Sequence, residues 1–280
     1  MSKKLLALYG LKWNPFSPEL PTEALLVSQK IDSFCWRVEN ALVREGGFAL
    51  ISGEPGSGKS VVLRLLAGRL SKLHGLVVGV LSHPSSRLAD VYRELGELFG
   101  IELRPHNRWA TFKSLRERWV AHMHETRLRP VLLIDEAQEL LPSVLAELRL
   151  LSSTKFDSRA VLTVVLAGDG RLAEKLRHVD LRPLDSRIRL RLSMDLATGE
   201  ELNACLNHLL EQAGNPTLMT EALKSAICDH ALGNYRAMTT IAATLLTVAL
   251  ERDLQQLDEK LYFEVFAPEP RKPRRAGARP

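Results

Sequence analysis

The chain has 280 residues, of which 45% are hydrophobic and 25% charged, and its formal charge is +5 at pH 7. These proportions allow a sizeable core and exclude a wholly disordered chain, and the length suits one large domain or two modest ones. The charge is uneven, because residues 268–280 hold five cations and one acid, a net +4 that leaves only +1 for the rest.

The cysteines and the apolar runs argue against two classes of protein. Cys35, Cys205 and Cys228 lie far apart, without the short spacing of zinc ligands or of a disulfide framework. This fits a reducing compartment and predicts a cytoplasmic protein. No uninterrupted apolar run approaches the ~18 residues that a membrane span needs, so no membrane partner is expected.

Proline and aromatic residues crowd the start of the chain. Tyr9, Trp13, Pro15 and Phe16 stand close together. Proline interrupts helices, whereas aromatic side chains favour burial. Residues 1–28 are therefore predicted to form an ordered but irregular arm that packs on a domain.

From residue 29 onward, helical and extended patterns alternate. A helix is expected over 29–45, and apolar strand-like runs follow at 48–52, 75–82, 131–134, 161–167 and 188–192. Helical patterns separate them, near 58–73, 87–99, 110–126, 138–152 and 171–177. Near-continuous apolar strands alternating with helices are typical of a parallel sheet covered on both faces. Residues 29–195 are thus predicted to be an α/β domain.

The strand signal stops after about residue 196. Three helical patterns remain, near 198–213, 219–231 and 233–252, with turn signals between them. They predict a small all-helical domain over 196–266. Residues 267–280 have too little apolar content to fold and are expected to be a disordered basic tail.

The stretch after the first predicted strand has the pattern of a phosphate-binding P-loop. Gly53, Gly58, Lys59 and Ser60 satisfy Gly-x-x-x-x-Gly-Lys-Ser/Thr, in which backbone N–H groups and a helix start converge on one anion. We expect ATP here, with Lys59 at the β- and γ-phosphates and Ser60 on Mg²⁺. The expected binding residues are Gly53, Glu54, Pro55, Gly56, Ser57, Gly58, Lys59, Ser60 and Val61.

Two carboxylates follow the strand predicted at 131–134. Asp135 is expected to hold Mg²⁺ with Ser60, directly or through water, and Glu136 to act as the base that orients the attacking water. The alternative is a solvated acidic pair that caps the next helix.

Asp169 follows the fourth predicted strand, within Gly168-Asp169-Gly170. This is where a sensor of the γ-phosphate is expected. An ordinary turn explains the same residues, because aspartate and glycine favour turns on conformational grounds.

Five arginines crowd residues 177–191, and alternation places three of them on one side of the last strand. We assign Arg187 as an arginine finger that enters the ATP site of a neighbouring copy. Arg177, Arg182 and Arg189 are alternatives, and a solvated basic face would explain the cluster without any such role. Arg236, at the start of the last helix, is expected to reach the nucleotide from the helical domain.

These motifs resemble those of AAA+ ATPases. The resemblance rests on Tyr9-Gly10-Leu11, Asn14-Pro15-Phe16, Gly53 to Ser60, Leu133 to Gln138, Leu166 to Leu172, Ser186 to Ile188 and Gly233 to Arg236. Within that class the chain is similar to the group that contains the transposition helpers of the TnsC, TniB, MuB and IstB kind and the secretion ATPase ExeA. Asp169 departs from the pattern, since the group more often has an uncharged polar residue there.

The resemblance implies a P-loop NTPase fold, a five-stranded parallel sheet with helices on both faces, followed by a small helical lid, with the N-terminal arm near the nucleotide site. It implies hydrolysis of ATP with Mg²⁺. It also implies assembly of copies into a ring or helical filament on double-stranded DNA, where the assembly regulates a transposase or selects its target.

Two other functions stay open. One is a soluble ExeA-like ATPase that acts on protein assembly in secretion, and the other is a DNA-repair or replication-loading ATPase. The secretion ATPase carries a membrane anchor and a periplasmic domain, neither of which we recognise in this sequence, and this favours the DNA-bound alternative.

DNA contacts in such an assembly are expected from Arg87, Arg108 and Lys113, the last two beside the aromatic Trp109. Phosphate contacts need only cations and hydroxyls, so the binding would be largely independent of base sequence and sensitive to salt. A solvent-facing helix surface is the alternative for residues 113–129.

Overall fold

The computed structural model describes residues 2–81, 83–84, 87–102, 107–155 and 158–266, and it divides into two compact units. An α/β unit comprises residues 21–197 together with 234–236. A helical unit takes in the residues before 21, residues 198–233, and those from 237 onward. The basic tail predicted at 267–280 lies outside the described residues.

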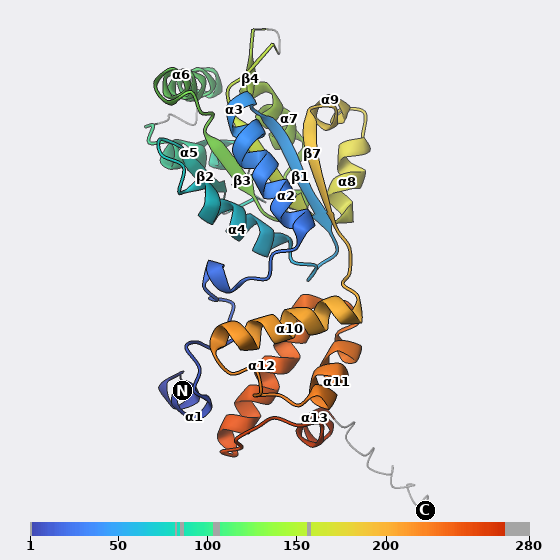
Figure 1. The fold of residues 1–280 in the computed structure, drawn as a ribbon. Coiled ribbons are helices and arrows are strands. Elements are labelled where there is room, and N and C mark those ends of the chain that lie inside the picture. The colour runs from blue at the N-terminus through green and yellow to red at the C-terminus, as the bar shows by residue number, and fades with distance from the viewer. Residues whose placement is uncertain (1, 82, 85–86, 103–106, 156–157, 267–280) are drawn as a thin grey trace, which may run out of the picture. The chain divides into compact units, whose positions relative to one another are not determined.

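A parallel sheet forms the centre of the α/β unit (Figure 1). Its strands are β1 (Gly47–Gly53), β2 (Val78–Leu81), β3 (Val131–Ile134), β6 (Thr163–Gly168) and β7 (Ile188–Met194), in the order β2-β3-β6-β1-β7. Every pairing within this sheet is parallel, which confirms the predicted five-stranded parallel sheet. A short antiparallel pair, β4 (Ser153–Thr154) with β5 (Arg159–Ala160), was not predicted.

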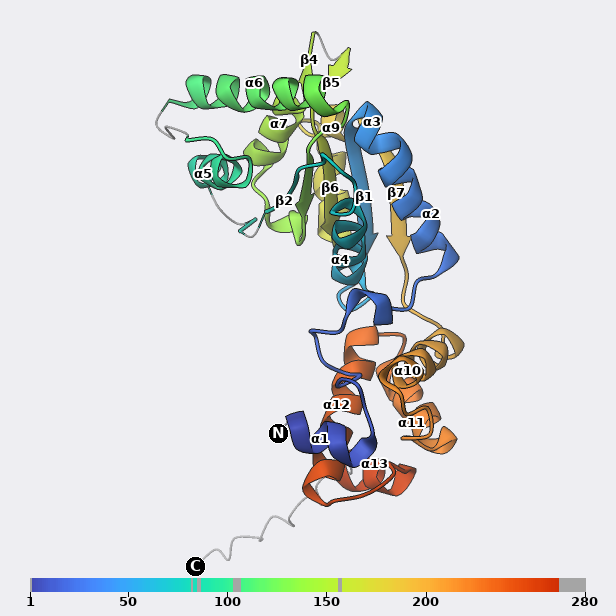
Figure 2. The ribbon, with the colours of Figure 1, turned by 60° about the vertical axis from the view of Figure 1, so that its left-hand side comes forward.

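Helices cover both faces of the sheet, as Figures 1 and 2 show. One face packs against residues of α2 (Gln29–Arg37), η2 (Val38–Leu42), α3 (Val43–Glu45) and α4 (Lys59–Leu70). The other packs against α5 (Leu88–Leu98), α6 (Arg108–Thr126), α7 (Pro142–Leu151), α8 (Gly170–Arg177) and α9 (Arg182–Asp185).

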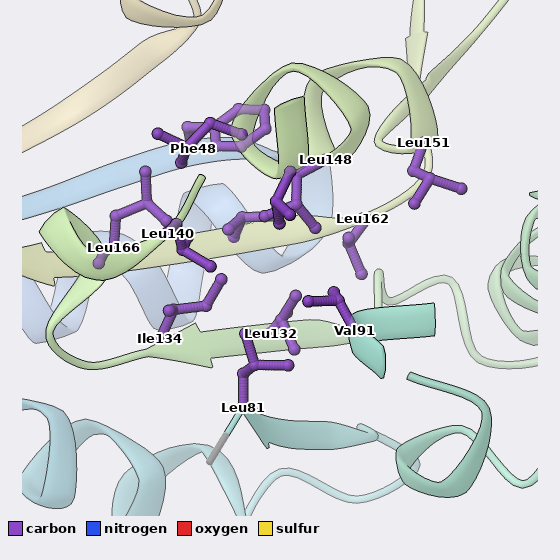
Figure 3. Close-up of a cluster of buried hydrophobic side chains, with 14 of the residues drawn as sticks. Phe48, Leu81, Val91, Leu132, Ile134, Leu140, Leu148, Leu151, Leu162 and Leu166 are labelled. Atoms are coloured by element: carbon purple, nitrogen blue, oxygen red, sulfur yellow. The ribbon is translucent and has the colours of Figure 1, made fainter. Parts of the chain in front are cut away.

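The central strands are apolar throughout because both their faces are buried. Leu132 and Ile134 of β3 belong to one core cluster, whereas Val131 and Leu133 belong to the other. Figure 3 shows the first cluster, in which strand residues such as Leu132 and Leu166 meet Leu148 of α7. This two-sided burial is why the strands read as continuous apolar runs.

Two predicted helices are interrupted in the structure. The segment 29–45 contains a π-helical stretch, Val38–Leu42, between α2 and α3. The segment 138–152 divides into a 3₁₀ turn, Ala137–Glu139, and α7, which begins at Pro142. Proline suits the first turn of a helix because its missing N–H would have no partner there.

The helical unit contains α1 (Ser2–Tyr9), α10 (Gly199–Ala213), α11 (Glu221–Ala231), α13 (Glu259–Phe266) and most of α12 (Tyr235–Glu251). Thr198 and Glu201 form a capping box that starts α10, in which each side chain satisfies a free N–H of the first turn. Neither α1 nor α13 was predicted. No helix among the described residues is long and apolar enough to cross a membrane.

The N-terminal arm is shared between the two units. The Lys12 amide donates to the Ala213 carbonyl at 2.8 Å, and the Asn215 side chain donates to the Tyr9 carbonyl at 2.9 Å. Residues up to Leu20 therefore pack with the helical unit, whereas residues from Pro21 belong to the α/β unit. The sequence predicts a single arm over 1–28.

Leu148 and Leu150 of α7 offer a matched test of the α/β core, since Leu148 is 1% exposed and Leu150 is 43% exposed. Leu148→Ala should lower the free energy of unfolding by about 2–5 kcal/mol, because it leaves a cavity. Leu150→Ala should change it by less than about 0.5 kcal/mol. Urea denaturation measures both values, and equal losses would contradict the assignment of Leu148 to the core.

Candidate active site

Three adjacent strands end at the same edge of the sheet and carry the predicted motifs. In the register of β1, β6 and β3, Ser52 pairs with Gly168 and Ile134 pairs with Leu166. The P-loop, Asp169 and Asp135 therefore follow neighbouring strand ends. The carboxyl edge of a parallel sheet is where α/β proteins hold their ligands.

The P-loop leaves no room for side chains at two of its glycines. A Cβ on Gly53 would lie 2.3 Å from the Met194 carbonyl oxygen of β7. A Cβ on Gly56 would lie 2.1 Å from the Asn234 Oδ1. Gly56 and Gly58 also have φ of +83° and +99°, which side chains rarely tolerate. The loop conformation thus depends on these glycines.

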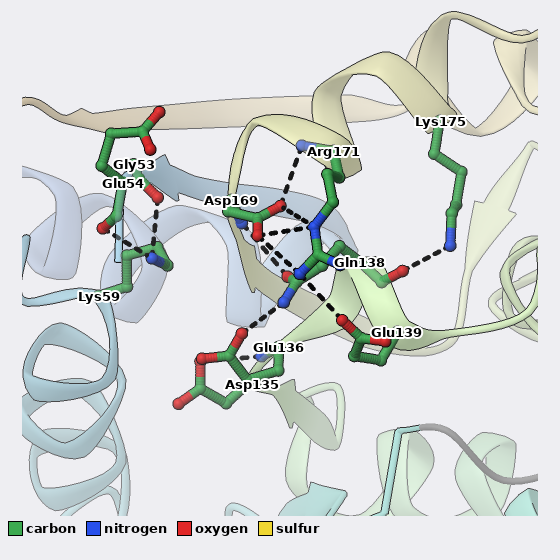
Figure 4. A network of polar contacts seen from close by, with 10 residues as sticks. All are labelled: Gly53, Glu54, Lys59, Asp135, Glu136, Gln138, Glu139, Asp169, Arg171 and Lys175. Atoms are coloured by element: carbon green, nitrogen blue, oxygen red, sulfur yellow. Dashed lines mark hydrogen bonds and ion pairs between the residues drawn. The ribbon is translucent and has the colours of Figure 1, made fainter. Parts of the chain in front are cut away.

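Lys59 starts α4 with its side chain folded over the loop (Figure 4). The residue is 5% exposed, and its Nζ donates to the carbonyl oxygens of Gly53 at 2.8 Å and Glu54 at 3.0 Å. These bonds use two of the three N–H donors of the ammonium group. A phosphate in the loop would offer charged acceptors to the same donor.

The surroundings of Lys59 suit an anion. The Ser57 hydroxyl is buried and has no hydrogen-bond partner among the described residues. Ser60 lies exposed in the first turn of α4, where the free N–H groups of the helix favour negative charge. An orphaned hydroxyl, a tight glycine turn and a buried lysine fit a nucleotide phosphate.

Asp135 and Glu136 follow β3 and are held in a fixed arrangement. The Glu136 amide donates to Asp135 Oδ1 at 2.9 Å, and Glu136 itself has a left-handed backbone with φ of +48°. Such strain in a non-glycine residue costs on the order of 1–3 kcal/mol and is found at functional sites.

Gln138 links Glu136 to the neighbouring strand end, a role that the sequence analysis missed. It is 5% exposed, its Nε2 donates to Glu136 Oε2, and its Oε1 accepts the Asp169 amide at 3.2 Å. The end of β6 also fits closely around it, because a Cβ on Gly168 would lie 2.7 Å from Gln138 Oε1. In the sequence, only its position two residues after Glu136 indicated that Gln138 could contact the site.

Asp169 caps α8 and is paired with an arginine. Its Oδ1 accepts the Arg171 amide at 2.9 Å, and its Oδ2 lies 2.8 Å from Arg171 Nη2. The hydrogen bonds from Arg171, supported by the charge of Lys59, hold the pKa of Asp169 below its ordinary value. Arg171 also pairs with Glu139 at 3.0 Å. Asp169 thus stands at the junction of β6 and α8 as a helix cap, and the sensor role stays a prediction.

Residues 234–236 belong to the α/β unit and contact the P-loop from outside. The Asn234 Nδ2 donates to the Pro55 carbonyl at 3.0 Å, and the Tyr235 amide donates to the Gly56 carbonyl at 3.1 Å. Arg236, the predicted nucleotide contact, is exposed in the same segment. Asn234 was not predicted to have a role.

The arginines near β7 differ in their surroundings. Arg189 pairs with Glu45 at 2.6 Å, and Arg191 pairs with Asp185 at 2.7 Å, so both are held by carboxylates of the same chain. Arg187 donates to the Pro183 carbonyl. The other two candidates, Arg177 and Arg182, are exposed.

Of the residues predicted to contact DNA, Arg108 is bound inside the unit. Its guanidinium donates twice to Glu147, which is 3% exposed and also accepts the Tyr92 hydroxyl. Burial alone would raise the pKa of Glu147, but the hydrogen bonds from Arg108 and Tyr92 hold it below its ordinary value. Arg108 therefore anchors the start of α6 to α7, and its contact with DNA stays a prediction.

Lys113 lies on the outer side of α6. Its Nζ is 5.5 Å from the ring centroid of Trp109, which is 72% exposed. A groove of about 510 Å³ runs along this side, where its lining includes Phe112, Arg116 and Val120. Arg87 is exposed before α5, and its neighbours Ser85 and Ser86 lie outside the described residues.

Comparison with known proteins agrees with this geometry. Residues 43–176 match the family model described as an AAA domain. General secretion pathway protein A of Aeromonas hydrophila is 30% identical over 243 residues, which cover 80% of this chain and 43% of that protein. The chain thus spans less than half the length of this relative.

Two solved structures share the fold. Cdc6p of Pyrobaculum aerophilum has a TM-score of 0.69 at 17% identity, covering 87% of this chain and 67% of that one. The ORC1 protein of Aeropyrum pernix, solved in complex with DNA, has a TM-score of 0.64 at 18% identity, covering 89% and 67%. The narrower likeness to transposition helpers stays a prediction. Residues 43–176 thus match an AAA domain, and the chain shares the α/β fold of these P-loop NTPase structures.

Proposed function

We propose that the chain is an ATP-controlled assembly switch that works on double-stranded DNA. The observation that carries the ATPase part is that Lys59 follows β1 while Asp135 and Glu136 follow β3, at the same edge of the sheet and on either side of β6. These are the parts that phosphoryl transfer requires, namely a phosphate cradle, a metal ligand and a base.

In the proposed reaction, Lys59 leaves the carbonyls of Gly53 and Glu54 and binds the β- and γ-phosphates of ATP. Glu136, held by Gln138, takes a proton from the attacking water. The water oxygen bonds to the γ-phosphorus as the bond to the β–γ bridging oxygen breaks, which gives ADP and phosphate. Ser60 and Asp135 would hold Mg²⁺, which supplies charge neutralisation at the phosphates.

The proposal includes a second copy of the chain. The α/β unit supplies the phosphate cradle and the base. Phosphoryl transfer also uses an arginine that stabilises the transition state. Arg189 and Arg191 already pair with Glu45 and Asp185 of their own chain. Arg187 of a neighbouring copy is the residue that we assign to this role. Occupancy by ATP would then favour a ring or filament, and hydrolysis would release it.

For DNA, the support comes from the outer side of α6 and from the fold. Lys113 and Trp109 offer an exposed cation and an aromatic ring, and the similar fold of ORC1 was solved with DNA. Contacts of this kind recognise phosphate rather than base sequence. A transposase is the partner that we propose for the DNA-bound assembly, which would recruit it or select its target.

A secretion-type function is the second candidate, and one observation favours it. The relative with 30% identity is a general secretion pathway protein. In that case the same ATP switch would act on protein partners, and the groove along α6 would face protein rather than DNA.

The first test separates nucleotide binding from hydrolysis. Lys59→Ala should abolish ATP and ADP binding, because it removes the buried cation of the P-loop. Glu136→Gln should still bind ATP but hydrolyse it about 100-fold or more slowly, the usual effect of losing a general base, and it should accumulate assembled complexes. Glu97→Gln, an exposed position on α5, is the matched control. Normal turnover by Glu136→Gln would rule out its role as base.

The second test asks whether Arg187 acts in the ATP site of a neighbouring copy. Arg187→Ala should bind ATP but lose turnover by about 10³-fold or more, whereas Arg189→Ala should retain it. Mixing Arg187→Ala with Lys59→Ala should restore some activity, because the first supplies an intact site and the second an intact finger. Loss of turnover in Arg189→Ala with normal Arg187→Ala would reassign the finger.

The third test addresses DNA. Lys113→Gln should weaken ATP-dependent binding to unrelated duplexes by similar factors and reduce the slope of log K against log salt by about 0.9 per lost phosphate contact. Lys72→Gln, exposed after α4, should change neither. Fluorescence anisotropy with two duplexes over a salt series measures this. No affinity for duplex DNA with any nucleotide would overturn the DNA function and favour the secretion-type one.

A further inference from the structure

Asn234 lies far along the chain from the P-loop but touches its apex. Its Nδ2 donates to the Pro55 carbonyl at 3.0 Å, across 179 residues of sequence. The next backbone amide, of Tyr235, donates to the Gly56 carbonyl at 3.1 Å. Two consecutive carbonyls of the loop are therefore bound from the same short segment.

These bonds determine the direction of a loop amide. The peptide between Pro55 and Gly56 is planar and trans, since the chain has no cis peptide bond among the described residues. In a trans peptide the C=O and the N–H point in opposite directions. A Pro55 carbonyl that is held toward Asn234 therefore directs the Gly56 N–H away from Asn234.

The same side chain accounts for the glycine at position 56. A Cβ there would lie 2.1 Å from Asn234 Oδ1 and 2.6 Å from its Nδ2. The carboxamide thus lies where a Cβ at position 56 would be, so a side chain there would have to displace it. Asn234 and Gly56 form a matched pair, in which each restricts the other.

We propose that Asn234 is a positioning residue of the nucleotide site, which fixes the Pro55–Gly56 peptide so that the Gly56 N–H is ready for phosphate. It does not touch the reacting atoms. This inference rests on the proposed binding of nucleotide in the P-loop, and it adds a residue that neither the P-loop pattern nor the pair Asp135-Glu136 contains.

The main test compares Asn234→Ala with Asn40→Ala. Asn40 of the π-helical segment also donates to a backbone carbonyl, that of Trp36 at 2.9 Å, but it lies outside the loop. Asn234→Ala should raise the Kd of fluorescently labelled ADP and the KM for ATP about three- to tenfold, the range for one hydrogen bond. Its kcat should stay within about twofold, because Glu136 is untouched. Asn40→Ala should leave both values unchanged.

A double-mutant cycle tests the matched pair directly. Gly56→Ala should weaken ADP binding, because its methyl group meets the Asn234 carboxamide and because the φ of +83° at this position disfavours a side chain. Adding Asn234→Ala removes that clash, so the double variant should bind ADP more tightly than the two single losses combined predict. Additive losses would contradict the contact, as would an Asn234→Ala variant with unchanged Kd and KM.

The outcomes also separate this inference from the proposed function. If the wild-type chain and Lys59→Ala bind labelled ADP equally poorly, the nucleotide site itself is wrong. If Lys59→Ala loses binding but Asn234→Ala matches the wild type, only the positioning role fails. The denaturation midpoint of each variant shows whether a loss of binding comes from unfolding. Asn234→Leu keeps the bulk of the side chain but cannot donate a hydrogen bond, so it should show the same weaker ADP binding as Asn234→Ala.

Discussion

A P-loop must bring backbone amides within reach of phosphate, and this close approach excludes side chains from the loop. Here three separate parts of the α/β unit enforce it. Met194 of β7 closes on Gly53, Asn234 closes on Gly56, and α4 begins directly after the left-handed Gly58. The loop is therefore shaped by long-range packing as well as by its own glycines.

The parallel register of the sheet likewise fixes the positions of the acidic residues. Because β3, β6 and β1 are neighbours, Gln138 can hold Glu136 with one end and the Asp169 amide with the other. The strained backbone of Glu136, at φ of +48°, is supported by these contacts and by Asp135. Strain of this kind persists only where the surroundings determine the conformation.

Much of this was predictable from local patterns. Apolar runs indicated the five strands, and spacing alone indicated the P-loop and the pair Asp135-Glu136. The parts that were missed depend on distant partners. The pair of Arg108 with Glu147, for example, joins residues that lie 39 positions apart. The strands β4 and β5 are two residues long, too short for a periodic signal.

The strand at one edge of the sheet, β7, has a consequence for how copies of the chain can meet. An exposed strand edge invites a further strand to pair with it, which leads to uncontrolled aggregation. The exposed residues of β7 include Arg189 and Arg191, which pair with Glu45 and Asp185, and charged side chains on an edge strand disfavour pairing with a further strand. Extension of the sheet at this edge is thus disfavoured.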